Sequence, residues 1–214
     1  MKVTKLSLVL AAVVASVSVG TIHAQTAKKA VVAKSAVSSS TDALVFELGL
    51  LSNKAGSKTN VADQKGDGLY LAAGASQQVF KIDADQSIDL GALLTFTTST
   101  AKKDANEFSQ SEIGVRIPVT YRYKLDDFSL IGGAYVGYNV SQSGKQKVSG
   151  AETNVNYGDN GLYVGLTVGG SYQVSDYRFK LAYNLNLGDY GYSKEVGAIT
   201  LGVDWTGVSL PKLF

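Results

Sequence analysis

The sequence contains no cysteine, and its one histidine is His23. The absence of cysteine excludes a disulfide framework, a thiol nucleophile and a lipid-anchored N-terminal cysteine. His23 lies in a segment that we expect to be removed, so the rest of the chain has no histidine for a Ser–His or Asp–His mechanism or for a metal site. We therefore predict that the protein is not an enzyme and that it binds no metal or cofactor.

Long apolar runs are also missing after the N-terminus. Residues 1–24 combine Lys2 and Lys5, an apolar stretch from Leu6 to Val19 and a final alanine, which is the pattern of a cleaved secretory signal peptide. No later run approaches the roughly eighteen apolar residues of a transmembrane helix. Without the two signal lysines the chain has 18 basic and 18 acidic residues, a balance that does not indicate nucleic-acid binding.

From residue 43 onward, apolar residues alternate with small or polar residues at a period of two. The clearest example is residues 113–140, where Ile113 and Val115 share one face of an extended strand and Gly114 and Arg116 share the other. A polar break in the middle of this stretch predicts a hairpin. Each strand has about ten residues or more, which is the length that crosses a bilayer at a tilt.

The same pattern recurs and predicts eight strands. They cover approximately residues 43–52, 68–80, 86–98, 113–123, 128–140, 161–174, 177–187 and 195–205. Short turns alternate with longer polar connections, and the longer ones are residues 53–67, 99–110, 141–160 and 188–194. An even number of strands with short turns at one end and longer loops at the other is typical of outer-membrane barrels.

The volume of the side chains predicts which face points outward. An eight-stranded lumen has only just enough room for its own lining, and the apolar face carries too many large side chains to fit there. The other face is rich in glycine and small polar residues, which suits a packed interior, whereas a soluble exterior would carry many more charges. We therefore predict an all-β, eight-stranded antiparallel up-and-down transmembrane barrel with short periplasmic turns and long extracellular loops. A soluble, lipocalin-like ligand-binding barrel is the alternative.

Aromatic residues on the outward face gather near one end of the predicted barrel. If the N-terminus is periplasmic, eight of them lie toward the periplasmic ends of their strands, where aromatic rings suit a membrane–water boundary. This predicted aromatic girdle consists of Phe46, Tyr121, Tyr123, Phe128, Tyr172, Tyr177, Phe179 and Trp205.

Residues 43–214 resemble the small outer-membrane β-barrel superfamily that includes the OmpA transmembrane domain, OmpX and the opacity proteins. The resemblance rests on residues 114–123 (GVRIPVTYRY), on the glycine-rich residues 131–138 and on the terminal Phe214. It implies a location in the outer membrane of a Gram-negative-type bacterium, in contact with membrane lipids and lipopolysaccharide. It also implies that Phe214 is an assembly signal, which the barrel-assembly machinery would recognise.

Two positions should disturb the regular pairing. Pro118 removes a backbone donor from its strand, so we expect a local bulge there. Phe214 is out of phase with the last strand, and a bulge near Gly207 would restore its outward direction. The predicted organisation is a signal peptide at 1–24, a flexible periplasmic leader at 25–42 and the barrel at 43–214.

Charged residues on the inward face fall at related heights. An up-and-down strand order places Asp89 near Arg122, and it brings the carboxylates of the first and last strands near the cations of the seventh. Paired charges are much less costly to bury than single ones, so we predict an ionic network that plugs the lumen. The residues of this network are Glu47, Asp89, Arg116, Arg122, Arg178, Lys180 and Asp204.

These expectations together predict a monomeric, non-enzymatic protein with a plugged lumen. Its role would be to support envelope integrity or to bind a host molecule, lipopolysaccharide or another surface ligand through the long loops. A narrow pore for small solutes, formed by the same inward-facing charges, is the alternative function.

Overall fold

The computed structural model describes residues 42–155, 161–188 and 193–210. The chain divides into two units, residues 1–39 and 40–214, and all described residues belong to the second. They form the strands β1 (Ala43–Ala55), β2 (Lys65–Lys81), β3 (Gln86–Lys103), β4 (Asn106–Leu125), β5 (Phe128–Val148), β6 (Ala151–Val155), β7 (Leu162–Val174), β8 (Tyr177–Asn186) and β9 (Ser193–Trp205). No helix among the described residues is long and apolar enough to cross a membrane.

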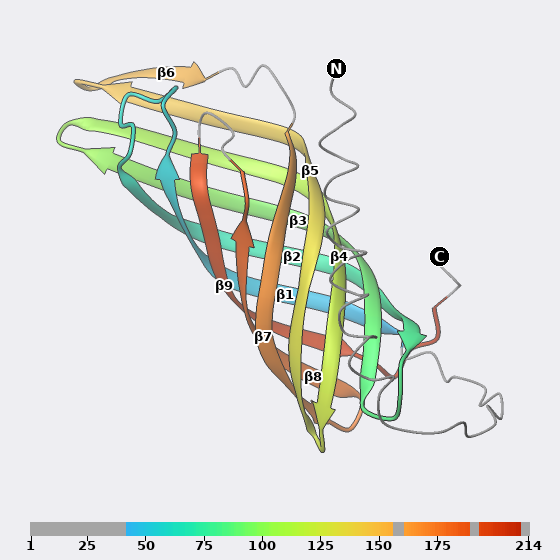
Figure 1. Ribbon diagram of the computed structural model, residues 1–214. Helices are drawn as coiled ribbons and strands as arrows, with labels where there is room; N and C mark the ends of the chain where they lie inside the picture. The colour runs from blue at the N-terminus through green and yellow to red at the C-terminus, as the bar shows by residue number, and fades with distance from the viewer. Residues whose placement is uncertain (1–41, 156–160, 189–192, 211–214) are drawn as a thin grey trace, which may run out of the picture. The chain divides into compact units, whose positions relative to one another are not determined.

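Eight of the strands close into an antiparallel barrel (Figure 1). Each pairs with its neighbours in sequence, except that β5 pairs with β7, and β1 closes the sheet by pairing with β9. The short strand β6 lies outside the barrel and pairs only with the far end of β5. The predicted eight-stranded up-and-down barrel is thus confirmed.

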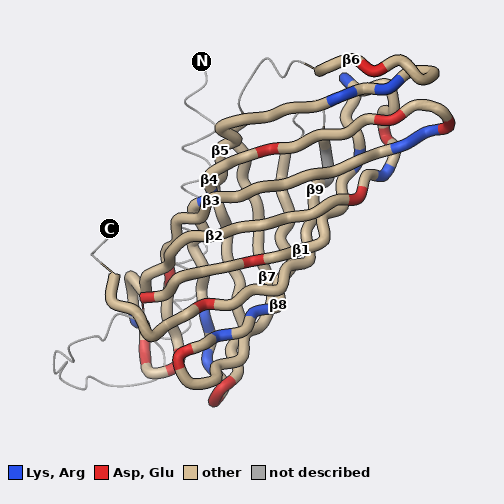
Figure 2. The backbone as a smooth tube through the Cα atoms, turned by 180° about the vertical axis from the view of Figure 1, so that it is seen from behind, with Lys and Arg blue, Asp and Glu red and all other residues tan. Residues whose placement is uncertain are grey.

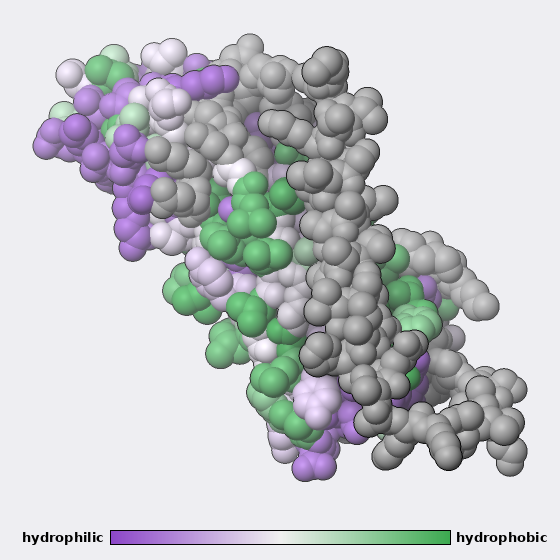
Figure 3. All heavy atoms as spheres, in the orientation of Figure 1, coloured by the Kyte–Doolittle hydropathy of each residue, from purple (hydrophilic) through white to green (hydrophobic). Residues whose placement is uncertain are grey.

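The apolar face points outward, as its volume predicted. In β1, Leu48 and Leu50 are 55% and 71% exposed, whereas Val45 and Leu51 are buried on the inside. Figure 3 shows apolar side chains over the middle of the visible barrel wall and hydrophilic ones toward both ends. This arrangement is the reverse of a soluble barrel, in which the large apolar side chains line the interior.

The two ends of the barrel differ. At one end, which we call the turn end, the strands are joined by the short segments 82–85, 126–127 and 175–176. Asp126 and Ser175, each the first residue of a two-residue turn, adopt positive φ values of 56° and 53°, as primed hairpin turns require at that position. At the opposite end, the hairpin end, β3, β4 and β5 project beyond the barrel together with β6.

The long-loop prediction is wrong for residues 99–110 and for most of 141–160. In the first segment, β3 and β4 continue to a two-residue turn at Asp104 and Ala105; in the second, β5 and β6 form a further hairpin. Both faces of these extensions contain polar residues, so no apolar alternation marks them as strands. The connection predicted at 53–67 is also shorter, because β1 ends at Ala55 and β2 begins at Lys65.

The projecting hairpins have a small apolar core of their own. Val61, from the connection between β1 and β2, is fully buried against Ala55, Ala101 and Phe108. The Asn60 side-chain amide also donates a hydrogen bond of 2.9 Å to the Lys147 carbonyl of β5. We call residues 56–64, 99–110 and 141–155 together the platform.

Both predicted bulges differ from the structure. Pro118 leaves a gap in the pairing of β4 with β3, but the register is the same on either side of it. Gly91 faces the ring across this gap, and a Cβ there would lie 2.9 Å from Pro118 Cγ, so the missing side chain accommodates the proline. At the C-terminal end, β9 stops at Trp205 and residues 206–210 are not a strand, so Gly207 is not in a bulge. Phe214, the signal peptide and the leader up to residue 41 lie outside the described residues.

Candidate functional site

The lumen contains seven charged side chains near the turn end. They come from five strands. Their neighbours along the chain point outward, and because successive side chains of a strand alternate between its two faces, these charged side chains point inward. Their side chains are between 3% and 15% exposed. They are the residues that the sequence predicted: Glu47, Asp89, Arg116, Arg122, Arg178, Lys180 and Asp204.

These charges form a chain in which cations and anions alternate. Arg116 Nη2 lies 2.6 Å from Glu47 Oε2, and the other oxygen of Glu47 lies 3.2 Å from Lys180 Nζ. Lys180 also lies 2.8 Å from Asp204. The order from there is Asp204 to Arg178 (3.4 Å), Arg178 to Asp89 (4.0 Å), and Asp89 to Arg122, whose guanidinium donates to Asp89 Oδ2.

The structure places Asp89 beside Arg122, and Asp204 beside Arg178 and Lys180. The guanidinium of Arg116 reaches Glu47 from across the lumen. The registers explain this contact, because the hydrogen-bonded partners of Glu47 lead through β2 and β3 to Gly114, only two residues from Arg116.

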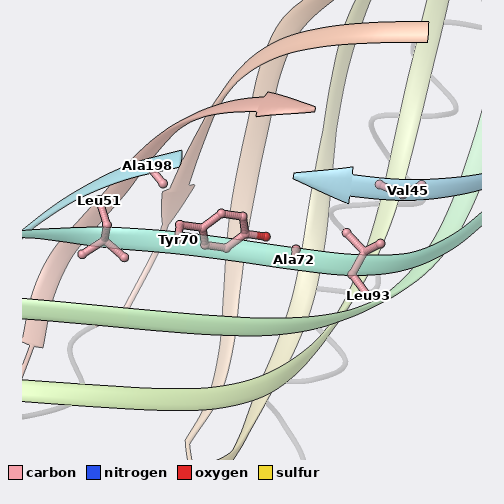
Figure 4. Close-up of a cluster of buried hydrophobic side chains, with 6 residues drawn as sticks. All are labelled: Val45, Leu51, Tyr70, Ala72, Leu93 and Ala198. Carbon is pink, nitrogen blue, oxygen red and sulfur yellow. The ribbon is translucent and has the colours of Figure 1, made fainter. Parts of the chain in front are cut away.

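Three inward-facing tyrosines surround Arg116, and the sequence did not single them out. The guanidinium carbon lies 5.2 Å from the ring centre of Tyr70 and 5.0 Å from that of Tyr135, which are cation–π distances. Tyr163 packs edge-on against Tyr135, with ring centres 6.2 Å apart. Figure 4 shows Tyr70 with the buried apolar residues of its cluster, which come from β1, β2, β3 and β9.

Glycines make room for two of these rings. Tyr135 on β5 is paired with Gly165 on β7, and Tyr163 on β7 is paired with Gly137 on β5. A Cβ at either glycine would overlap the opposite ring. The sequence signal for this arrangement is a tyrosine followed two residues later by a glycine on both strands.

The lumen toward the hairpin end carries mostly uncharged polar groups. Glu112 is the exception, and its carboxylate accepts hydrogen bonds of 3.3–3.4 Å from Thr97, Asn139 and Gln142.

The described residues leave two small lumen cavities, of about 40 and 60 Å³, which share Arg116 and Tyr135 in their linings. Each has room for only a few water molecules.

The predicted girdle residues lie on the outer face. All eight are between 39% and 54% exposed. Several are paired across strands, as Phe128 is with Tyr172, Tyr172 with Phe179, and Tyr177 with Trp205. These pairings place the rings in a band close to the short turns at 126–127 and 175–176.

The chemistry available in the lumen is electrostatic. Among the described residues, no three side chains of the His, Cys, Asp and Glu types gather as a metal site would require. The three carboxylates of the ion chain each contact at least one cation. Such an arrangement can hold strands together across the lumen and can obstruct it.

Comparison with known proteins shows the fold. No protein-family profile and no curated protein sequence matches this chain. Among solved structures, it is similar to Neisserial surface protein A, with 15% sequence identity and a TM-score of 0.51 over 78% of this chain and 97% of that one. An outer membrane channel from Pseudomonas putida F1 matches at 9% identity with a TM-score of 0.33, over 83% of this chain and 99% of that one.

Proposed function

We propose that this chain is a non-enzymatic protein of the bacterial outer membrane, with a closed lumen and a platform at the cell surface. One observation carries the proposal: a closed barrel exposes a continuous apolar wall and buries its charges. In water, such a wall would be an aggregation site, whereas in a bilayer it contacts lipid and the closed sheet leaves no unpaired strand edge. The fold shared with Neisserial surface protein A supports this location.

The orientation follows from the two ends. Outer-membrane barrels have short turns on the periplasmic side and longer segments on the extracellular side. We therefore place the turn end in the periplasm, with the aromatic girdle at that boundary, and the platform outside the cell. We also propose that Phe214 is an assembly signal that the barrel-assembly machinery recognises.

The ion chain supports the proposal of a closed lumen. It crosses the lumen through side chains from β1, β3, β4, β8 and β9, and Arg116 is packed between two tyrosine rings. An open pore would require several of these contacts to break together. The competing function, a narrow pore for small solutes, is favoured only by the two cavities, which meet at Arg116.

The platform is the part that we propose for surface binding. Five exposed lysines belong to it: Lys58, Lys102, Lys103, Lys145 and Lys147. Figure 2 shows blue segments, which mark Lys and Arg, at the hairpin end. Cations at the extracellular end of the barrel suit the phosphates of lipopolysaccharide, which would surround a monomeric barrel in the outer leaflet. A host molecule or another surface ligand would meet the same side chains.

Fractionation of cells tests the location, and a gel tests the barrel. We expect the protein in the outer-membrane fraction, and we expect the unboiled sample to migrate differently from the boiled one. A soluble protein whose migration does not change on heating would overturn the proposal.

Conductance of the purified barrel in a planar bilayer tests whether the lumen is closed. We expect no discrete channel steps. Regular steps would contradict the closed lumen and support the narrow pore.

A further inference from the structure

The ion chain has four cations and only three anions. It begins with Arg116 and ends with Arg122, so a cation stands at each end. Both ends lie on the same strand, β4, with Pro118 and Thr120 between them on the inward face. The chain therefore runs around the lumen and returns to its own strand, where a further anion would close it into a ring.

A cavity lies where that anion would fit. The cavity of about 60 Å³ is lined by Arg116, Pro118, Thr120 and Arg122 along β4. Both arginines are largely buried, with side chains 5% and 14% exposed. The Nε–H of each is buried and has no hydrogen-bond partner among the described residues.

The other inward-facing carboxylates do not supply the missing charge. Glu112 lines the other cavity and is bonded to neutral side chains. Asp42 accepts a hydrogen bond from the Leu210 amide and does not line this cavity. A surplus positive charge and two unpaired donors away from water are costly, so the arrangement favours a negatively charged ligand.

We propose that a small monovalent anion, of the size of chloride, binds in this cavity between Arg116 and Arg122 and completes the ring of alternating charges. The volume admits a small anion with one or two water molecules. Asp89 also lines this cavity, and its Oδ1 atom has no hydrogen-bond partner among the described residues. An anion cannot donate a hydrogen bond to that oxygen, so a water molecule is needed as well. This site would stabilise the barrel wherever it is located, so it does not depend on the proposed function.

Stability in different anions tests the site. The barrel is refolded into lipid vesicles in sodium gluconate, whose anion is too large for the cavity, and chloride then replaces gluconate at constant ionic strength. A ligand bound only by the folded state lowers the unfolding equilibrium constant by the factor 1 + [Cl⁻]/Kd. At a chloride concentration of ten times the Kd, this decrease is about tenfold. We expect a saturable rise of the urea midpoint. An unchanged midpoint would overturn the proposal.

Two variants of Thr120 provide the matched comparison. Thr120→Asp supplies an anion from the chain itself, so we expect a barrel whose midpoint in gluconate is already raised and no longer responds to chloride. Thr120→Asn has nearly the same size without the charge and should respond as the unaltered protein does. Equal chloride responses in both variants would contradict the site. Crystals soaked in bromide should show an anomalous peak in this cavity, and bromide peaks confined to the surface would also count against it.

Discussion

The barrel wall and the platform are built from the same continuous hairpins, yet they distribute their residues in opposite ways. In the barrel, Leu201 on the outside is 65% exposed, while the Asp204 carboxylate on the inside is almost fully buried. On the platform, Val61 and Phe108 are buried and the lysines are exposed. The β-sheet is common to both regions, so the proposed surroundings account for the difference in which residues the sheet buries: lipid around the wall and water around the platform.

The largest effect should come from removing one charge inside the barrel. Asp204 contacts both Lys180 and Arg178, so Asp204→Asn removes one of the two anionic partners of each of these buried cations. Breaking a buried ion pair in this way costs about 3–5 kcal/mol. Urea unfolding in lipid vesicles, followed by the fluorescence of Trp205, measures this loss.

A double variant separates pairing from general damage. Lys180→Met together with Asp204→Asn removes one cation and one anion and restores the original surplus of a single cation. We expect the double variant to lose less stability than Asp204→Asn alone. A double variant that is as unstable as the single variant, or less stable, would show that these two residues do not act as a pair.

The next largest effect should come from placing a charge on the outer wall. Leu201→Arg exposes a guanidinium to the hydrocarbon core, which costs about 2–4 kcal/mol near the midplane of a bilayer. Val148→Arg is the matched control, since Val148 is also an exposed apolar residue but lies on the platform. There we expect a change within about 0.5 kcal/mol, as for other surface substitutions. Equal losses at the two positions would remove the distinction between wall and platform.

A smaller and local effect is expected in the platform core. Val61→Ala removes two methyl groups from the contact with Ala55, Ala101 and Phe108, at a cost of about 1–2 kcal/mol. The barrel below should keep its heat-dependent migration, and added protease should cleave residues 56–64 faster. If unfolding of the whole barrel and cleavage of this segment accelerate together, the platform is not an independent unit.

The smallest effect is expected at the exposed ion pair of the platform. Lys145 Nζ lies 2.6 Å from Glu152, and this hydrogen bond raises the pKa of Lys145 above its usual value. The stability from a raised lysine pKa is fully present at pH values below the unfolded pKa, and it is lost as the pH rises through the folded pKa. Exposed pairs contribute little, so Glu152→Gln should leave the urea midpoint at neutral pH unchanged. A measurable decrease would mean that charges on the platform are organised as they are in the lumen.

The sequence was most informative where one side of the strand faces away from water. Alternation between Leu48, Leu50 and their inward neighbours predicted the barrel and its apolar exterior. The lumen has no room for so many large side chains, so they must lie on the outer face. The same alternation predicted which charges point inward. It could not identify the strands at 99–110 and 141–155, because water contacts both faces of the platform and nothing there requires a period of two.

Contacts across the lumen were harder to predict than contacts between neighbouring strands. Asp89 and Arg122 lie on adjacent strands, so their heights could be compared by counting residues. Arg116 reaches Glu47 from a strand that is not adjacent to β1, and this contact depends on strand stagger and on the length of the arginine side chain. The tyrosines around Arg116 depend on pairings of Tyr135 and Tyr163 with glycines, which require the register of β5 against β7.

Labelling of single cysteines on intact cells tests the central claim most directly, and the natural chain has no cysteine to interfere. The claim is that the apolar wall is inside a bilayer while the platform is outside the cell. A membrane-impermeant maleimide should therefore modify Val148→Cys rapidly and should leave Leu201→Cys unmodified until the membrane is dissolved in denaturant. Equal labelling of both positions on intact cells would place the wall in water and would contradict the account.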